Sequence, residues 1–176
     1  MAMMPETLWT ARLVLRLLGP DDLEAAHALF SSAGHTIGDG PVADRDDTTQ
    51  WLARRQMRYA TQGLAWYGLW NDDPTLVGNC GVFVGRRCGD EPEIGYEIHL
   101  AHRGQGLAQE AANAVTQAAH DAGHEHLWAT IRPSNLASAH IVASLGYRLI
   151  RSHVDGKGPL DYYLSSATPR VEVGST

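Results

Sequence analysis

The segment Glu97 to Ala108, with the sequence EIHLAHRGQGLA, places two closely spaced glycines between a strand-like run and an alanine-rich run. Glu93 to Leu100 alternates in polarity as a strand does, and Gly106 to His120 has the composition of a helix. Glycines at such a junction let the backbone approach a ligand closely, and the first N–H groups of the helix lack partners within it. The segment therefore predicts a site for an anion such as a pyrophosphate.

Two better-known phosphate loops do not match this segment. A Walker loop ends in Gly-Lys-Ser/Thr, whereas Leu107 and Ala108 follow Gly106 here. A Rossmann fingerprint requires a third glycine where Gln109 stands, and an acidic residue at the end of a strand about 20 residues further on. Glu125, at that distance, instead precedes a strand. On spacing alone, a plain tight turn without a ligand is as good an interpretation as a phosphate site.

The runs on either side of the segment predict a single mixed α/β domain with its core at about 11–165. We expect strands at 11–18, 64–70, 75–84, 93–100 and 126–132, helices at 21–33, 48–63, 106–120 and 133–144, and a closing hairpin of 147–154 with 160–165. Residues 34–47 are rich in glycine and aspartate and are expected to form a loop, followed much later by a flexible tail at 166–176.

Composition limits the classes of protein to which the chain can belong. Its 176 residues carry a formal net charge of −6, which disfavours non-specific binding to the phosphate backbone of nucleic acids. Of these residues, 44% are hydrophobic, which suits one globular domain. No apolar run reaches the roughly 20 residues that span a bilayer. The N-terminus also lacks the pattern of a secretion signal. We therefore expect a cytoplasmic protein with no membrane partner.

The residues that most often bind metals do not form a convincing site. Cys80 and Cys88 could pair with each other, but two cysteines make neither a disulfide framework nor a four-ligand zinc set. His120, His124 and His126 lie close together in the sequence. A glycine ends the predicted helix between them and breaks the shared face that two ligands would need, so no metal site is predicted.

Two motifs resemble those of the GNAT superfamily of N-acetyltransferases. Arg-x-x-Gly-x-Ala at 103–108 is similar to its acetyl-CoA loop. Asn135-Leu-Ala-Ser138, followed by Ser144-Leu-Gly-Tyr147, resembles the signature of its ribosomal-protein N-terminal acetyltransferase (RimJ/RimL-like) branch. The resemblance extends over 11–164 and implies a GNAT fold, in which helices flank a largely antiparallel sheet that is splayed at its centre. Dimerisation is common in that branch, but nothing in the spacing shows a homodimer here.

The resemblance implies an enzyme that moves the acetyl group of acetyl-CoA to a primary amine by direct attack in a ternary complex. The acceptor would be a protein N-terminal α-amine, a peptide or a small-molecule amine. We expect residues 34–47 to contribute to the choice of acceptor. Two other classes remain open: a non-catalytic acyl-CoA-binding or sensor domain on the same scaffold, and a nucleotide-binding turn of another kind. Turnover with an amine would exclude the first, and competition by ATP or NAD against CoA would identify the second.

The resemblance also assigns cofactor contacts to individual residues. The pantetheine arm would pair with the backbone of Ile98, His99 and Leu100, where one N–H would polarise the thioester carbonyl and lower the barrier by about 3–4 kcal/mol. The pyrophosphate would lie mainly on the backbone of the loop residues Arg103, Gly104, Gln105, Gly106, Leu107 and Ala108. The guanidinium of the first of these either adds charge there or is a solvated side chain beside a turn.

Glu97 is the leading candidate for the general base. A free α-amine has a pKa of about 8 and a lysine of about 10.4, so a group or a water must accept a proton at neutral pH. Alternation places Glu97 on the opposite face from Ile98, toward the expected acceptor side. The alternative is an ordinary polar residue on a solvated strand face. His99, on the same face, is a second candidate for the base.

Asn135 and Ser138 lie one helical turn apart and so share a face. By the resemblance, Asn135 would hold the pantetheine or its neighbouring loop, and the Ser138 hydroxyl would hydrogen-bond the departing thiolate. Asn135 could instead cap the helix, although Ser134 is a rival for that position. Many members of the superfamily carry a tyrosine general acid in this last helix. This chain has Ile141-Val-Ala there, so Ser138 or a water would have to serve.

Overall fold

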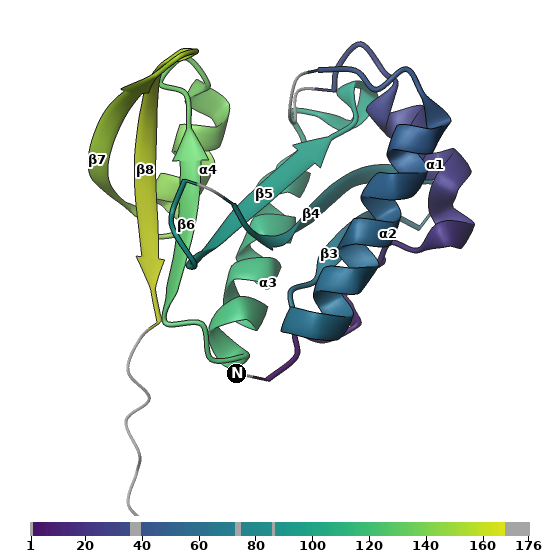
Figure 1. Ribbon diagram of the computed structural model, residues 1–176, viewed down its shortest axis with the longest axis horizontal. Coiled ribbons are helices and arrows are strands. Elements are labelled where there is room, and N and C mark those ends of the chain that lie inside the picture. Colours follow the sequence, from purple (N-terminus) through teal and green to yellow (C-terminus); the bar gives the residue numbers. More distant parts are fainter. Residues whose placement is uncertain (1, 36–39, 73–74, 86, 168–176) are drawn as a thin grey trace, which may run out of the picture.

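The computed structural model describes residues 2–35, 40–72, 75–85 and 87–167 (Figure 1). These residues form an eight-stranded sheet in the order β1-β2-β3-β4-β5-β6-β8-β7. The strands are β1 (Thr7–Trp9), β2 (Val14–Leu17), β3 (Trp66–Trp70), β4 (Leu76–Val84), β5 (Pro92–Ile98), β6 (His126–Ile131), β7 (Arg148–Asp155) and β8 (Gly158–Ser166). The helices are α1 (Leu23–Phe30), α2 (Arg45–Gln62), α3 (Leu107–Asp121) and α4 (Leu136–Ser144), with short 3-10 turns η1 (Pro20–Asp22) and η2 (Leu100–His102).

The sheet is open at its centre, between β5 and β6. The other neighbouring strands pair antiparallel, whereas β5 and β6 run parallel and are in register only at Glu93 and Trp128. From that pair the two strands diverge toward their carboxyl ends (Figure 1). The predicted α/β fold, with a largely antiparallel sheet splayed at its centre and helices beside it, is therefore confirmed.

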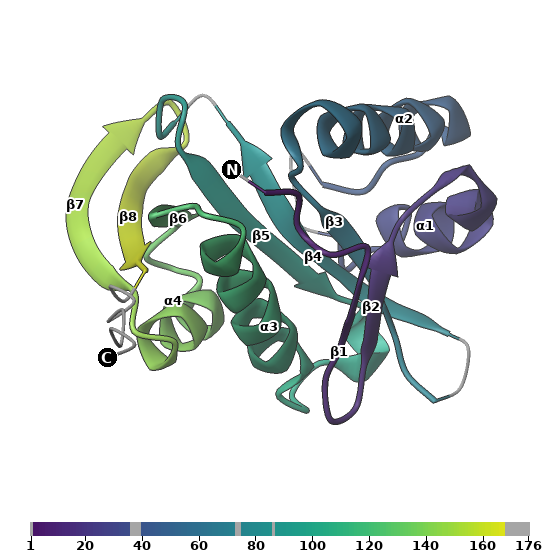
Figure 2. The ribbon, with the colours of Figure 1, turned by 90° about the horizontal axis from the view of Figure 1, so that it is seen from below.

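The helices cover both faces of the sheet (Figure 2). α3 packs on one face through small and branched side chains such as Ala111, Ala112 and Val115, all fully buried. On the other face, Leu52 of α2 packs against Trp66 of β3. In α3, apolar side chains that repeat at three and four residues form the stripe that faces the sheet. Because β5 is covered from both sides, most of its residues are buried, including polar ones.

The N-terminal elements differ from those predicted. β2 is shorter than the strand expected at 11–18, and it pairs with β1, a strand that the sequence analysis missed. The helix expected at 21–33 is divided into η1 and α1. The division occurs at Asp22, whose carboxylate accepts the N–H of Gly19 and pairs with Arg16. These contacts of the buried carboxylate fix the backbone before α1, so α1 begins at Leu23 and the two aspartates are not part of one long helix.

α2 begins three residues before its predicted start. The carboxylate of Asp44 accepts the N–H of Asp46 at 2.8 Å and caps the helix at Arg45. The loop expected at 34–47 is correspondingly shorter, and its residues 36–39 lie outside the described residues. The acidic first turn, which looked like part of the loop, is favoured by the positive end of the helix dipole.

The C-terminal half agrees closely with the prediction. The expected hairpin is formed by β7 and β8. β8 continues to Ser166, so the first residue of the expected tail belongs to a strand, and residues 168–176 of that tail lie outside the described residues. Cys80 and Cys88 are both free thiols, so the disulfide considered above is not formed. No helix in the described part of the chain combines the length and apolarity needed to cross a membrane.

The side chains of His120 and His126, near the end of α3, have protein partners. His120 Nδ1 is 2.7 Å from the carbonyl oxygen of His124, and His126 Nδ1 is 2.6 Å from the Glu91 carboxylate. Across the described ranges, no group of three or more His, Cys, Asp or Glu side chains is arranged to hold a metal ion.

Candidate active site

The loop from β5 to α3 presents backbone N–H groups at the carboxyl end of the splayed strand. Gly104 and Gly106 have φ values of 76° and 77°, in the left-handed region that favours glycine. Gly106 is the N-cap residue of α3, and no side chain of the described residues caps this helix. The first N–H groups of a 15-residue helix therefore point outward, as an anion site requires.

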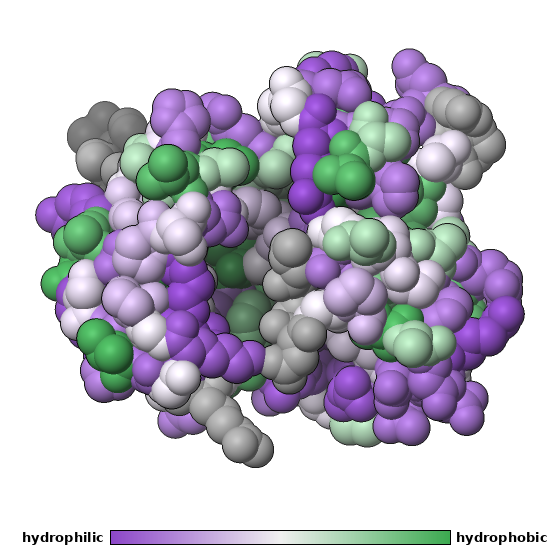
Figure 3. All heavy atoms as spheres, turned by 90° about the horizontal axis from the view of Figure 1, so that it is seen from above, coloured by the Kyte–Doolittle hydropathy of each residue, from purple (hydrophilic) through white to green (hydrophobic). Residues whose placement is uncertain are grey.

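A cavity of about 650 Å³ lies between this loop, β5 and α4. Seen from above, the molecule is hollowed between the halves that the splay separates (Figure 3). Most of the residues predicted for the site line the cavity, namely Glu97, Ile98, Arg103, Gly104, Gly106, Leu107, Ala108, Asn135 and Ser138. The two motifs that lie far apart in the sequence therefore meet at one place.

Three predicted residues lie elsewhere. β5 ends at Ile98, two residues earlier than expected, His99 is the N-cap residue of η2 and Leu100 is the first residue of that turn. His99 Nδ1 accepts the N–H of Ala101 at 3.4 Å, and His99 does not line the cavity. Leu100 is 60% exposed. Gln105 is exposed, and its carbonyl oxygen accepts a hydrogen bond from within the protein.

The donor to Gln105 is Arg12, in the turn between β1 and β2. Its Nη1 lies 2.7 Å from the Gln105 carbonyl oxygen, and its Nη2 lies 2.6 Å from the Glu110 carboxylate in the first turn of α3. Although partial burial raises it, hydrogen bonds from Thr10 and Arg12 hold the pKa of Glu110 below its usual value. The β1–β2 hairpin, which the sequence analysis missed, therefore supports the loop between β5 and α3.

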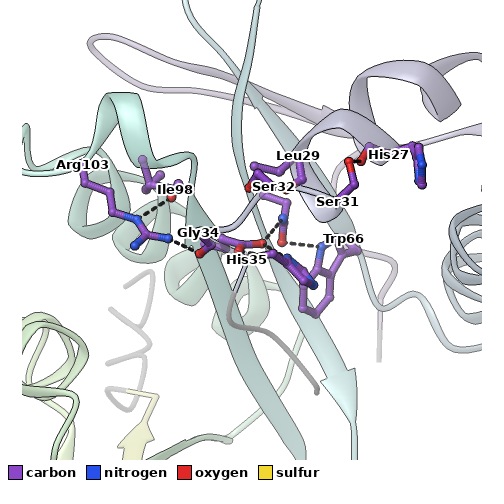
Figure 4. Close-up of polar contacts among 11 residues, drawn as sticks. His27, Leu29, Ser31, Ser32, Gly34, His35, Trp66, Ile98 and Arg103 are labelled. Carbon is purple, nitrogen blue, oxygen red and sulfur yellow. Dashed lines mark hydrogen bonds and ion pairs between the residues drawn. The ribbon is translucent and has the colours of Figure 1, made fainter. Parts of the chain in front are cut away.

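Arg103 is exposed, and its guanidinium makes two hydrogen bonds to backbone carbonyl oxygens outside the loop. Its Nε donates to the Ile98 carbonyl oxygen at 2.9 Å and its Nη2 to the Gly34 carbonyl oxygen at 2.5 Å (Figure 4). Arg103 therefore joins the end of β5 to the turn that follows α1. The sequence analysis predicted neither of these two backbone contacts.

Glu97 is buried and paired with a histidine that the sequence analysis did not single out. Its carboxylate oxygens lie 2.9 and 2.8 Å from His35 Nδ1, and the two residues are 5% and 6% exposed. Asn79 Nδ2 lies 3.4 Å from one of these oxygens, and the Trp66 indole N–H donates to Asn79 at 3.1 Å (Figure 4). The alternative of a solvated strand residue is therefore wrong. His35 is 62 positions away, and no local pattern marks it.

α4 begins at Leu136, three residues after its predicted start at residue 133, and Asn135 is its N-cap residue. Asn135 Oδ1 accepts the N–H of Ser138 at 3.1 Å, so Asn135 and not Ser134 caps the helix. The Tyr96 hydroxyl of β5 donates to the Ser138 carbonyl oxygen at 3.3 Å. Burial raises the pKa of Tyr96 to about 12, which keeps this hydroxyl protonated at neutral pH. The last helix lacks a tyrosine, but one from β5 reaches it.

Tyr147, in the Leu-Gly-Tyr ending, is a packing residue, as the sequence suggested. Its ring is buried, and its hydroxyl lies 2.9 Å from the Thr116 hydroxyl of α3. This contact fastens the end of α4 to the helix that carries the phosphate loop.

Comparison with known proteins places this geometry in a family. A family model described as Acetyltransferase (GNAT) domain matches residues 12–148. The N-acetyltransferase p20 of Bacillus licheniformis, an uncharacterized protein, is 24% identical, with 96% of this chain and 99% of that one covered. A Bordetella pertussis protein assigned to the GNAT acetyltransferases has a TM-score of 0.81 at 23% identity, covering 92% of this chain and all (100%) of that one.

A further solved structure shares the fold at low identity. It is RimL, a ribosomal L7/L12 α-N-protein acetyltransferase in complex with coenzyme A, with a TM-score of 0.80, 15% identity, and 93% of this chain and 97% of that one covered. At that identity the likeness concerns the fold. The family model, which spans most of the chain, agrees with the splayed sheet and the loop before α3, and the chain belongs to the GNAT acetyltransferase family.

Proposed function

We propose that this protein transfers the acetyl group of acetyl-CoA to a primary amine, with a protein N-terminal α-amine as the first acceptor to test. The observation that carries the proposal is the meeting of two features in one cavity. The loop at Gly104 and Gly106 offers backbone donors for a pyrophosphate, and Glu97 lines the same cavity. The RimL structure suggests the class of acceptor, since that protein acetylates an α-amine and shares this fold.

The residues present fit acetyl-CoA. The loop backbone at 103–108 and the uncapped start of α3 would hold the pyrophosphate. His99 donates its N–H to Val77 of β4, so by alternation the backbone N–H of Ile98 faces the splay, where a pantetheine arm would add as a strand. Bound acetyl-CoA supplies an acetyl group activated as a thioester. The protein positions the reacting groups and accepts the proton that the amine loses.

Two side chains take part in the proposed transfer. Glu97 accepts the proton that the amine must lose as its nitrogen forms the new bond to the acetyl carbon. Ser138, on the opposite wall, donates its hydroxyl hydrogen bond to the sulfur as the carbon–sulfur bond breaks. The Asn135 side chain accepts the Ser138 N–H and the Tyr96 hydroxyl donates to the Ser138 carbonyl oxygen. These two hydrogen bonds fix the backbone that carries the Ser138 side chain.

The test is a transfer assay with acetyl-CoA and three sets of acceptors: peptides with a free α-amine, lysine-containing peptides with a blocked N-terminus, and small amines. Mass spectrometry identifies the acetylated product, and a thiol reagent measures the CoA released. We expect transfer to a free α-amine. Tight CoA binding without transfer to any amine would favour a binding domain, and failure of CoA to bind in calorimetry would overturn the proposal.

A further inference from the structure

The turn that follows α1 is built to hold an imidazole. The His35 N–H donates to the Ser32 carbonyl oxygen at 3.0 Å, and the Ser32 hydroxyl donates to the Leu29 carbonyl oxygen at 2.8 Å. The Phe30 ring packs against the His35 ring, with centroids 5.2 Å apart. These contacts come from the end of α1 and leave the imidazole directed at the carboxylate of Glu97 on β5 (Figure 4).

The Glu97 carboxylate is held from two sides. His35 Nδ1 is within hydrogen-bond distance of both oxygens, and Asn79 Nδ2 approaches one of them from β4. Asn79 is itself fixed by the indole N–H of Trp66. A buried carboxylate is costly unless it is paired, and hydrogen bonds from more than one direction fix its rotation. Glu97 is the member of the pair that lines the cavity, so His35 acts on the cavity through it.

Arg103 fixes the backbone on both sides of the pair. It donates to the carbonyl oxygen of Gly34, the residue before His35, and to that of Ile98, the residue after Glu97. A planar guanidinium can hold two acceptors in a set geometry, which a lysine ammonium on a flexible stem does less well. A Cβ at Gly34 would lie 3.3 Å from Arg103 Nη2, so the turn and the clamp are closely packed.

We propose that His35 is a positioning residue for acetyl transfer, which holds the Glu97 carboxylate toward the cavity, and that Arg103 is the clamp that keeps the two in register. The inference rests on the proposed function, because it gives Glu97 the proton transfer. It adds that the first residue of the phosphate-loop motif acts on the acceptor side of the site. The side chain of Arg103 thereby connects the cofactor loop to the Glu97–His35 pair.

The experiment measures kcat and the KM for acetyl-CoA in the full-length protein with His35→Leu, His35→Asn, Glu97→Gln and the double change His35→Leu with Glu97→Gln. We expect His35→Leu to lower kcat by up to about 100-fold, the cost of a misplaced reacting group, with little change in KM. His35→Asn should recover most of kcat, because its amide nitrogen stands where Nδ1 stood. The double variant should be no slower than Glu97→Gln alone, since a residue that acts through Glu97 has nothing left to position.

His27 provides the matched control. It is a histidine of α1 whose Nδ1 lies 2.9 Å from the Thr48 hydroxyl, and His27→Leu should leave kcat unchanged. The inference is overturned if His35→Leu turns over at the rate of the unaltered protein, or if the double variant falls well below Glu97→Gln. In the first case the unaltered protein still transfers acetyl groups and the proposed function stands. If the unaltered protein transfers to no amine, the proposed function itself is overturned.

Arg103→Lys tests the clamp separately. We expect kcat to fall about tenfold while the KM for acetyl-CoA changes less than threefold, because one ammonium cannot hold both carbonyls. The control is Arg132→Lys, since Arg132 likewise donates to two carbonyls, those of Gly158 and Pro159, in the C-terminal hairpin. Its kinetics should match the unaltered protein. A large rise in KM for acetyl-CoA with kcat intact would mean that Arg103 binds phosphate, and the clamp would be wrong.

Discussion

The two sides of the cavity are built in different ways. The phosphate side, where we propose that the pyrophosphate binds, consists of consecutive residues, because the strand end, the glycines and the start of α3 all lie within 97–108. The acceptor side, where we propose that the amine binds, brings together His35, Asn79 and Glu97 from the α1 turn, β4 and β5. A site made of backbone N–H groups can be encoded by a short motif. A buried pair of side chains requires several elements to be in place at once.

The largest expected effect comes from breaking the phosphate side at Gly106. Gly106→Val places a branched side chain at a φ of 77° and in front of the N–H groups of α3. We expect CoA binding to fall below detection in calorimetry.

Gly89 gives a control for backbone strain alone, because its φ is 66° and it lies in the β4–β5 connection, away from the cavity. Gly89→Val should carry a similar conformational cost of about 1–2 kcal/mol and still bind CoA. Loss of CoA binding in both variants would point to general destabilisation instead of a phosphate site at Gly106.

The next effect is on the acceptor side. Glu97→Gln should leave CoA affinity nearly unchanged and lower kcat by about 100-fold or more, the usual contribution of a positioned general base. Calorimetry with CoA and steady-state kinetics over a range of pH measure the two quantities. If turnover stayed the same at every pH, Glu97 would have no part in proton transfer, although the phosphate side would be unaffected.

A smaller effect is expected where the two sides meet, at α4. Ser138→Ala removes one hydroxyl that is proposed to hydrogen-bond the leaving sulfur, worth about 1 kcal/mol, and should lower kcat about fivefold. Ser144→Ala is the matched control, because Ser144 does not line the cavity and its hydroxyl donates to the Ile141 carbonyl oxygen in the same helix. Equal rates for Ser138→Ala and the unaltered protein would remove Ser138 from the mechanism.

The smallest effect on activity is expected beneath the site. Tyr147→Phe leaves the buried Thr116 hydroxyl without its tyrosine partner and should lower the free energy of unfolding by about 1–3 kcal/mol. Denaturant unfolding measures that change. The kcat should stay close to that of the unaltered protein, and a large loss of kcat would show that Tyr147 does more than pack.

Prediction from the sequence succeeded where the determinants are local. Alternation and helical periodicity located most elements, and errors fell at their ends, where caps such as Asp44 and Asn135 decide the first helical residue. The strand β1 escaped because three residues carry too little pattern. For the site, Ser138 and all of the loop at 103–108 except Gln105 line the cavity. His99 does not line it, because β5 ends at Ile98, two residues before the predicted end of the strand.

From the sequence alone, periodicity predicted one mixed α/β domain and the glycine loop before α3, because these signals act over a few residues. The splay of the sheet and the family were implied by the resemblance of two motifs to the GNAT superfamily. Tertiary structure alone decided that Glu97 is buried, that His35 is its partner and that Arg103 turns away from the loop to hold Gly34 and Ile98. The reason is physical: burial and pairing of polar side chains depend on which distant elements pack together. The sequence of a single strand predicts only which side chains share a face, and it does not predict which partners bury them.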